Sequence, residues 1–238
     1  MQMNASSIVN QKAEWEKLGV KLPAFDHAAM TAATKEHPIW VHFGAGNIFR
    51  GFIAALQQRL LNEGVADRGI IAADTFDYDI IDKIYTPYDN LTMNVTLNPD
   101  GTTSREIIGS VAEGLRANSA DAEMMARFKQ IFTDPSLQMI SFTITEKGYA
   151  LYRPDGSCLP PKQAAEKMLA GIEAIAAQCN HLIIVSNEVF SGGADYAGET
   201  DLYLQALAMV NNAVAAKADA VCRVVCGLPV YYKGGERP

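Results

Sequence analysis

Two glycines, a basic residue and an acid carry the clearest chemical potential in this sequence. Gly44-Ala45-Gly46 follows an apolar run, Arg50 comes shortly after it, and Asp74 closes the next apolar run. Glycines between a strand and a helix let the backbone approach a pyrophosphate, whose charge then faces the N–H groups at the helix start. An acid at the end of the second strand accepts ribose hydroxyls and repels a 2′-phosphate, which favours NAD over NADP. The sequence therefore predicts an NAD site without a metal, with the contact residues Gly44, Ala45, Gly46, Asn47, Arg50 and Asp74.

The glycine turn also has a plainer interpretation, as an ordinary connection between a strand and a helix. Its third glycine is Gly51, five residues after Gly46, whereas the common dinucleotide fingerprint places that glycine three residues later. Asp77 and Asp79 are rival acids, although both fall in the predicted opening of the next helix. The strand before the turn, the amphipathic helix after it and the acid at the next strand end favour the dinucleotide interpretation.

Two further positions have chemistry with more than one interpretation. Glu146-Lys147 follows the predicted strand Met139–Thr145. These charges are either a solvated pair on a loop or residues at the nicotinamide or substrate edge of the site, because ligands bind at carboxyl ends of strands in open α/β sheets. His42 lies within a predicted strand and faces either the core or the cofactor, and a satisfied core histidine is the favoured interpretation. The sequence assigns no catalytic base.

The elements around these residues alternate between strands and helices. An apolar run, the glycine turn, a helix-periodic segment and a second apolar run form one βαβ unit. A polar turn at Asn98–Gly101 predicts a hairpin insertion, with its return strand at Ile107, Ile108 and Val111. We therefore predict an α/β fold with a doubly wound, mostly parallel, Rossmann-like sheet. The expected elements in this part are helices at 8–18, 26–36, 50–62 and 121–132, and strands at 39–43, 69–73, 91–97 and 139–145.

The clearest break in the chain is the turn-rich stretch 154–161. We expect a dinucleotide-binding region at 1–153, a linker at 154–161 and a second α/β segment at 162–238. In the second segment the patterns predict helices at 162–178 and 199–217 and buried strands at 182–185 and 221–225, which add to a single sheet.

Composition limits the partners and the compartment. The 20 Lys and Arg against 27 Asp and Glu give a net charge of −7, which argues against nucleic acid and anionic membranes. No apolar run is long enough to span a bilayer and no secretory signal is visible, so a soluble, cytoplasmic protein is expected. The four cysteines are expected to be buried and inert, with no metal: Cys158, Cys179, Cys222 and Cys226.

The segments 40–51, 73–74 and 143–149 resemble the long-chain mannitol dehydrogenase family, in particular its D-mannonate oxidoreductase (fructuronate reductase) branch. The resemblance covers 1–153. It implies an NAD-dependent enzyme that transfers a hydride between nicotinamide and a sugar-acid or polyol carbon, with Glu146 and Lys147 near the nicotinamide. It also implies a catalytic lysine with Asn and His partners in a following helical domain. No Lys-x4-Asn-x2-His pattern occurs in this sequence.

The region 162–234 resembles the C-terminal part of adenosylcobinamide kinase / adenosylcobinamide-phosphate guanylyltransferase. That family works through a P-loop, but no Gly-Lys dipeptide occurs here. Three functions therefore stay open: an oxidoreductase, a non-catalytic nucleotide-binding module and a cobalamin-biosynthesis remnant. The expected partner is a small-molecule sugar acid or polyol. The chain is expected either to form a homo-oligomer or to need a partner chain that completes its site.

Overall fold

The computed structural model describes residues 2–143, 153, 156–193 and 196–235. The chain divides into two compact units, Met1–Thr145 and Glu146–Pro238.

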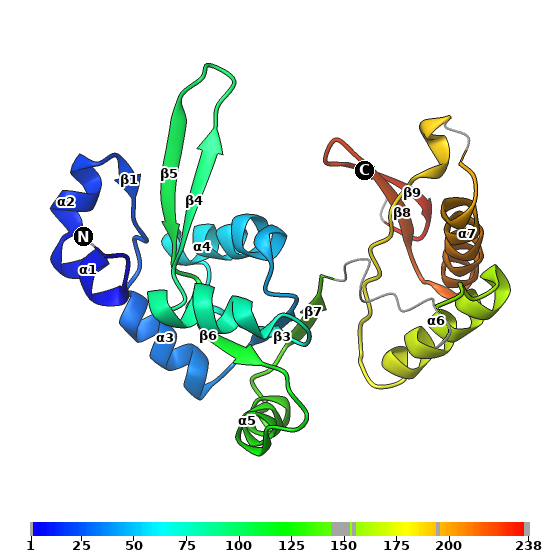
Figure 1. Ribbon diagram of the computed structural model, residues 1–238, viewed down its shortest axis with the longest axis horizontal. Helices are drawn as coiled ribbons and strands as arrows, with labels where there is room; N and C mark the ends of the chain where they lie inside the picture. Colours follow the sequence, from blue (N-terminus) through cyan, green and yellow to red (C-terminus); the bar gives the residue numbers. More distant parts are fainter. Residues whose placement is uncertain (1, 144–152, 154–155, 194–195, 236–238) are drawn as a thin grey trace. The chain divides into compact units, whose positions relative to one another are not determined.

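The centre of the first unit is a parallel sheet of four strands (Figure 1). Its order is β6 (Val111–Arg116), β3 (Ile70–Asp74), β2 (Trp40–Phe43) and β7 (Met139–Phe142). All three pairings are parallel. Counted along the chain the strands stand in the order 3-2-1-4, which is the order of a Rossmann sheet.

Helices cover both faces of this sheet because alternate strand residues point to opposite sides. Ile70 and Ala72 of β3 pack on one side with Ala54, at the start of α4 (Ala54–Asn62). Ile71 and Ala73 pack on the other side against α5 (Ala122–Thr133). The predicted doubly wound α/β fold is therefore confirmed.

The predicted hairpin is present as an insertion between β3 and β6. It consists of β4 (Thr92–Leu97) and β5 (Thr103–Ile108), and β1 (Val20–Lys21) adds a third strand beside β5. The predicted return strand was wrong in one respect: Ile107 and Ile108 end β5, whereas Val111 begins β6 of the parallel sheet. The hairpin contacts the glycine-turn helix, because the Asn94 side-chain amide donates to the Gly51 carbonyl at 3.0 Å.

The helices of the first unit depart from simple α-helices in several places. The predicted helix at 8–18 is two short ones, α1 (Ala5–Asn10) and α2 (Lys12–Lys17). Asp26 caps α3 (His27–Glu36) as expected, accepting from the Ala29 N–H at 3.0 Å. The segment before α4 is a π-helix, η1 (Phe49–Ile53), and a second π-helix, η2 (Ile80–Tyr85), runs into the 3-10 turn η3 (Thr86–Tyr88).

The second unit is built from a helix pair and a hairpin. Helices α6 (Pro161–Ala176) and α7 (Glu199–Lys217) match the predicted ranges closely and are joined by a Glu173–Lys217 ion pair. A 3-10 turn, η5 (Phe190–Gly192), precedes α7. Strands β8 (Val221–Val225) and β9 (Leu228–Lys233) form an antiparallel pair.

Three expectations about the second unit were wrong. Residues 182–185 form no strand and are exposed. Strand β8 exists, but it is mostly exposed and pairs only with β9, so it adds nothing to the parallel sheet. The cysteines are not buried. Cys158 is half-buried, and Cys179, Cys222 and Cys226 are exposed. These segments are apolar enough to be buried, but among the described residues no neighbouring strand of the parallel sheet pairs with them.

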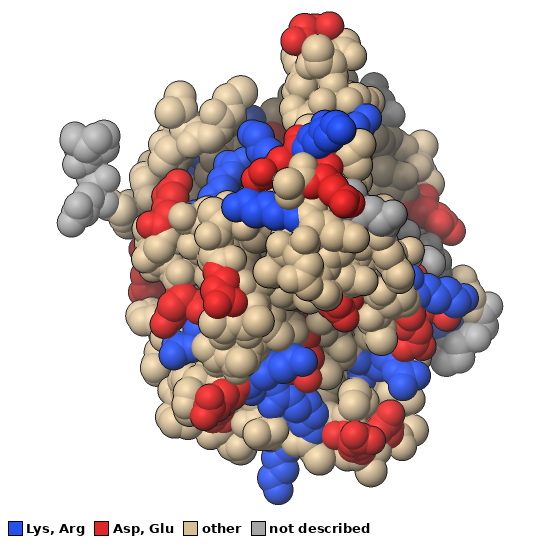
Figure 2. Space-filling model, turned by 90° about the vertical axis from the view of Figure 1, so that its left-hand side faces the viewer, with Lys and Arg blue, Asp and Glu red and all other residues tan. Residues whose placement is uncertain are grey.

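Within the described ranges, no helix has the length and apolar character to cross a membrane. The same residues contain no group of three or more His, Cys, Asp or Glu that could hold a metal ion. On the face drawn in Figure 2, the Lys and Arg side chains are interspersed with Asp and Glu. This face therefore offers no continuous basic track of the kind that binds a nucleic-acid backbone.

Candidate functional site

The glycine turn connects β2 to the helical segment that contains η1. The Gly44 N–H donates to the Ala73 carbonyl at 2.9 Å, which ties the turn to β3. Gly44 has a φ of +110°, and a Cβ there would lie 2.6 Å from the Thr143 carbonyl oxygen. A Cβ at Gly46, by contrast, would meet nothing within 4 Å. The turn is therefore tightly packed at its first glycine and open at its second, where a ligand can approach the backbone.

Asp74 lies at the carboxyl end of β3, directly against the turn. Its Oδ2 accepts from the Ala45 N–H at 3.2 Å. Its Oδ1 accepts from the N–H groups of Phe76 and Asp77 at 2.9 and 2.8 Å. Three backbone donors thus fix the carboxylate, and Oδ2, which accepts one of them, keeps a lone pair for a further donor such as a ribose hydroxyl.

The two rival acids lie differently. Asp77 is exposed, and among the described residues its side chain makes no hydrogen bond to the turn. Asp79 is exposed and accepts from Lys83 Nζ at 2.6 Å. Of the three candidate acids, the structure brings Asp74 to the glycine turn.

Arg50 lies on η1 beside a hollow of about 280 Å³. Its Nη2 donates to Asn47 Oδ1, and its Nε is buried without a hydrogen-bond partner among the described residues. The hollow is formed with the segment after β3, by Asp77, Asp79, Ile80, Lys83 and Ile84. A larger hollow of about 480 Å³ near β1 contains none of the predicted site residues.

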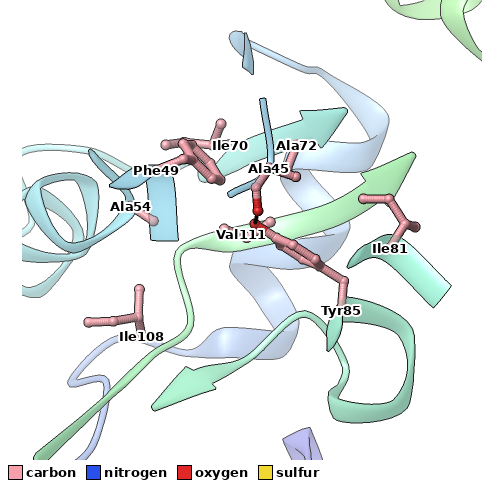
Figure 3. Packing of buried hydrophobic residues seen from close by; sticks show 9 residues of the cluster. All are labelled: Ala45, Phe49, Ala54, Ile70, Ala72, Ile81, Tyr85, Ile108 and Val111. Carbon is pink, nitrogen blue, oxygen red and sulfur yellow. Dashed lines mark hydrogen bonds between the residues drawn. The ribbon is translucent and has the colours of Figure 1, made fainter. Parts of the chain in front are cut away.

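Tyr85 is a further residue that contacts the glycine turn, and the sequence patterns did not identify it. This buried residue ends η2, and its hydroxyl donates to the Ala45 carbonyl at 3.0 Å (Figure 3). Burial raises the pKa of Tyr85 well above its ordinary value, so the hydroxyl stays a donor. The available signal was the spacing of four residues between Ile81 and Tyr85, which puts both on one helix face, since a buried tyrosine needs a partner for its hydroxyl.

The structure confirms the interpretation of His42 as a core histidine with hydrogen-bond partners. It is buried and stacks on Phe49, with 4.2 Å between ring centroids. Its Nδ1 lies 2.7 Å from Ser141 Oγ and its Nε2 lies 2.9 Å from Thr143 Oγ1. Burial lowers the pKa of His42 to about 4, so the ring is neutral at pH 7.

A hydrogen-bond chain runs from Trp40 through Ser141 and His42 to Thr143. Trp40 Nε1 can only donate, and it donates to Ser141 Oγ at 2.7 Å. The neutral His42 ring donates from one nitrogen and accepts at the other, so it bridges the hydroxyls of Ser141 and Thr143 in either tautomer. Both ring nitrogens therefore have partners, as a core histidine requires.

Strands β2 and β7 are where the strand order reverses, and their carboxyl ends flank the position at which Rossmann sheets bind ligands. The glycine turn and Thr143 both lie at this edge. Glu146 and Lys147, predicted for the nicotinamide or substrate edge, lie outside the described residues.

Comparisons with known proteins match the two parts of the chain to different proteins. Residues 139–232 match the profile of the family described as cobinamide kinase / cobinamide phosphate guanyltransferase. D-mannonate oxidoreductase of Thermotoga maritima is 48% identical over 171 residues, which are 72% of this chain and 31% of that protein. Mannitol 2-dehydrogenase of Cereibacter sphaeroides is 29% identical over 133 residues, which are 55% of this chain and 25% of that protein.

The crystal structure of Pseudomonas fluorescens mannitol 2-dehydrogenase with NAD and D-mannitol matches with a TM-score of 0.50. Its sequence is 24% identical, and the match covers 69% of this chain and 32% of that one. The chain thus spans between a quarter and a third of the length of these relatives. Both resemblances inferred from the sequence are confirmed, although the cobinamide-type match begins at residue 139 and not at 162. The similarity to the solved structure shows a shared fold over 69% of this chain.

Proposed function

We propose that the first unit binds NAD at the glycine turn and belongs to an oxidoreductase acting on a sugar acid or polyol. The observation that carries the proposal is the contact between the Asp74 carboxylate and the Ala45 N–H, at the carboxyl edge of a sheet in Rossmann order. The pyrophosphate lies over Gly46, where the backbone is open, with Arg50 beside it. The adenosine ribose donates a hydroxyl to Asp74 Oδ2.

The named activities of the relatives support the substrate class. One is a D-mannonate oxidoreductase, and another is a mannitol 2-dehydrogenase solved with NAD and D-mannitol. Bound NAD supplies the acceptor for a hydride from a CH–OH carbon. The hydroxyl proton needs a base within hydrogen-bond reach, and the described residues at the sheet edge present none. We propose that a partner chain or a further segment completes the site.

NADH fluorescence titration tests the cofactor placement directly. Asp74→Ala removes the acceptor for a ribose hydroxyl and the hydrogen bond to the turn, so we expect the Kd for NADH to rise about tenfold or more. Asp67→Ala is the matched control, because this acid is exposed, pairs with Arg68 and lies outside the turn and the hollow. Unchanged NADH affinity in Asp74→Ala contradicts the placement.

A turnover assay separates the oxidoreductase from a binding module that does no chemistry. The full chain is mixed with NAD and D-mannonate or D-mannitol, or with NADH and fructuronate or fructose, and the absorbance of NADH is followed. Turnover supports the enzyme. NADH binding without turnover by this chain alone fits both the binding module and an enzyme whose site a partner chain completes, and turnover that appears when the partner chain is added supports the enzyme.

The match over residues 139–232 favours a second candidate for the second unit, the binding of a nucleotide or corrinoid. The phosphoryl transfer of that family needs a P-loop lysine, and no Gly-Lys dipeptide occurs in the sequence. We propose binding without transfer for this segment. Titration with cobinamide and with GTP tests it, and the absence of any saturable signal for either ligand refutes it.

The predicted boundaries, 1–153 and 162–238 joined by 154–161, stay part of the proposal. Limited proteolysis of the full chain tests them. Cleavage confined to 154–161 supports the linker, and early cleavage elsewhere contradicts it.

A further inference from the structure

Tyr85 contacts both groups that are proposed to face the diphosphate, the Ala45 peptide of the glycine turn and the Arg50 guanidinium. It comes forty residues after Ala45 in the chain, on a different element, yet its hydroxyl reaches the Ala45 carbonyl at 3.0 Å. Its ring lies 6.0 Å from the Arg50 guanidinium carbon. Figure 3 shows the Tyr85 side chain crossing the cluster that contains Phe49 and Val111 to reach Ala45.

The Ala45 peptide groups are held by side chains and not by sheet or helix hydrogen bonds. Its N–H donates to Asp74 Oδ2 at 3.2 Å, and its C=O accepts from Tyr85. Ala45 itself is fully buried. Both flanking residues are glycines, which have the largest conformational freedom of any residue. Without these two side-chain contacts the Ala45 peptide groups have to be ordered by the ligand, at the expense of affinity.

Arg50 depends on the same residue for its position. The only described hydrogen bond of its side chain is to Asn47, three residues earlier. The face of an aromatic ring attracts a guanidinium group, and this attraction is stronger where water is excluded. The Tyr85 ring therefore supports Arg50 at the hollow beside the turn.

We propose that Tyr85 is a positioning residue that preforms the anion site: its hydroxyl fixes the Ala45 peptide and its ring seats Arg50. This inference rests on the proposed NAD binding. It assigns to one buried side chain the order of both groups that face the diphosphate. The ligand class that depends on Tyr85 is therefore the dinucleotides and nucleoside diphosphates, and not nucleosides.

Two variants separate the hydroxyl from the ring. Tyr85→Phe keeps the ring and removes the hydrogen bond, and we expect about a three- to tenfold rise in the Kd for NADH. Tyr85→Leu removes both contacts, and we expect a larger rise. Adenosine, which lacks the diphosphate, is expected to bind the full-length wild type and Tyr85→Phe equally. Ile108→Val, in the same buried cluster, is the control for a core change that leaves the turn contacts intact.

Hydrogen exchange of the Gly46 and Asn47 amides in the cofactor-free chain gives a second readout. We expect faster exchange in Tyr85→Phe and no change in Ile108→Val. If the variant binds NADH as the wild type does, or loses adenosine and NADH in equal proportion, the positioning role is refuted. If exchange rises but the wild type binds no NADH, the turn-fixing role of Tyr85 stands and the NAD proposal fails.

Discussion

The buried His42 makes the stability of the first unit depend on pH between neutrality and mild acid. Its pKa is about 4 in the folded protein, against 6.5 in its ordinary state, because burial disfavours the charged ring. The unfolded chain therefore takes up the proton first as the pH falls. A histidine with a depressed pKa contributes its full stability above 6.5 and loses that stability as the pH drops toward 4.

The size of the effect follows from these two values. At pH 7 the ring is mostly neutral in both states, and at pH 5 it is mostly charged in the unfolded state and mostly neutral in the folded one. The difference lowers the free energy of unfolding by about 2 kcal/mol between pH 7 and pH 5. The pKa of His27 is lowered by burial as well, which adds to the loss. The depressed carboxyls Asp100 and Asp134 titrate below this window.

Urea unfolding at pH 7, 6 and 5 measures this loss. Both tryptophans of the sequence, Trp15 and Trp40, lie in the first unit, so their fluorescence reports its unfolding alone. We expect the pH dependence to shrink by about 2 kcal/mol in His42→Gln, and His27→Asn serves to isolate the second histidine. An equal free energy of unfolding at pH 7 and pH 5 in the wild type refutes the argument from burial.

Three further outcomes are expected. Gly44→Ala costs at least about 2 kcal/mol in urea unfolding, because of its φ of +110° and the 2.6 Å approach to Thr143 O, whereas Gly46→Ala leaves stability unchanged and weakens NADH binding. Arg127→Ala costs about 1–3 kcal/mol in the same assay, because it leaves the Glu113 carboxylate, 2.7 Å away and mostly buried, without its partner; a smaller loss contradicts this. A thiol reagent is expected to label the exposed Cys179, Cys222 and Cys226 in the native chain without denaturant. Mass spectrometry of the labelled peptides measures this, and protection of any of the three contradicts their exposure.

The first unit could be predicted well because its patterns are local and mutually consistent. The runs that end before Gly44 and at Asp74 have the continuous apolar character of buried strands, and the segment between them has a helical period. Their order then leaves few topologies, since βαβ connections are almost always right-handed. Asp74 was identified for the same reason, because the end of a strand can be located from the sequence.

The contacts that complete the site were beyond reach because they join distant residues. Nothing in the sequence near Ala45 indicates that its carbonyl accepts a hydrogen bond from the Tyr85 hydroxyl. The π-helical turn at Phe49–Ile53 has no sequence signature comparable with a glycine or proline.

The second unit shows the opposite failure. The apolar run 182–185 has the composition of a buried strand, but composition cannot supply the neighbouring strands that burial requires. Strand β8 illustrates the same point, since among the described residues it pairs with the next strand in the chain, β9, and with no strand of the parallel sheet. Sequence patterns indicate which segments are able to pack, and the partners decide whether they do.

The pairing of β2 with β7 also sets an order of events during synthesis. Trp40 and Ser141 are 101 residues apart, so β2 leaves the ribosome long before its second neighbour exists. Until Phe142 has emerged, one edge of Trp40–Phe43 stays unpaired and open to other strands. The Gly44 turn lacks its Thr143 wall over the same interval. Nascent chains that stall before residue 139 therefore expose an unpaired sheet edge beside an incompletely packed glycine turn.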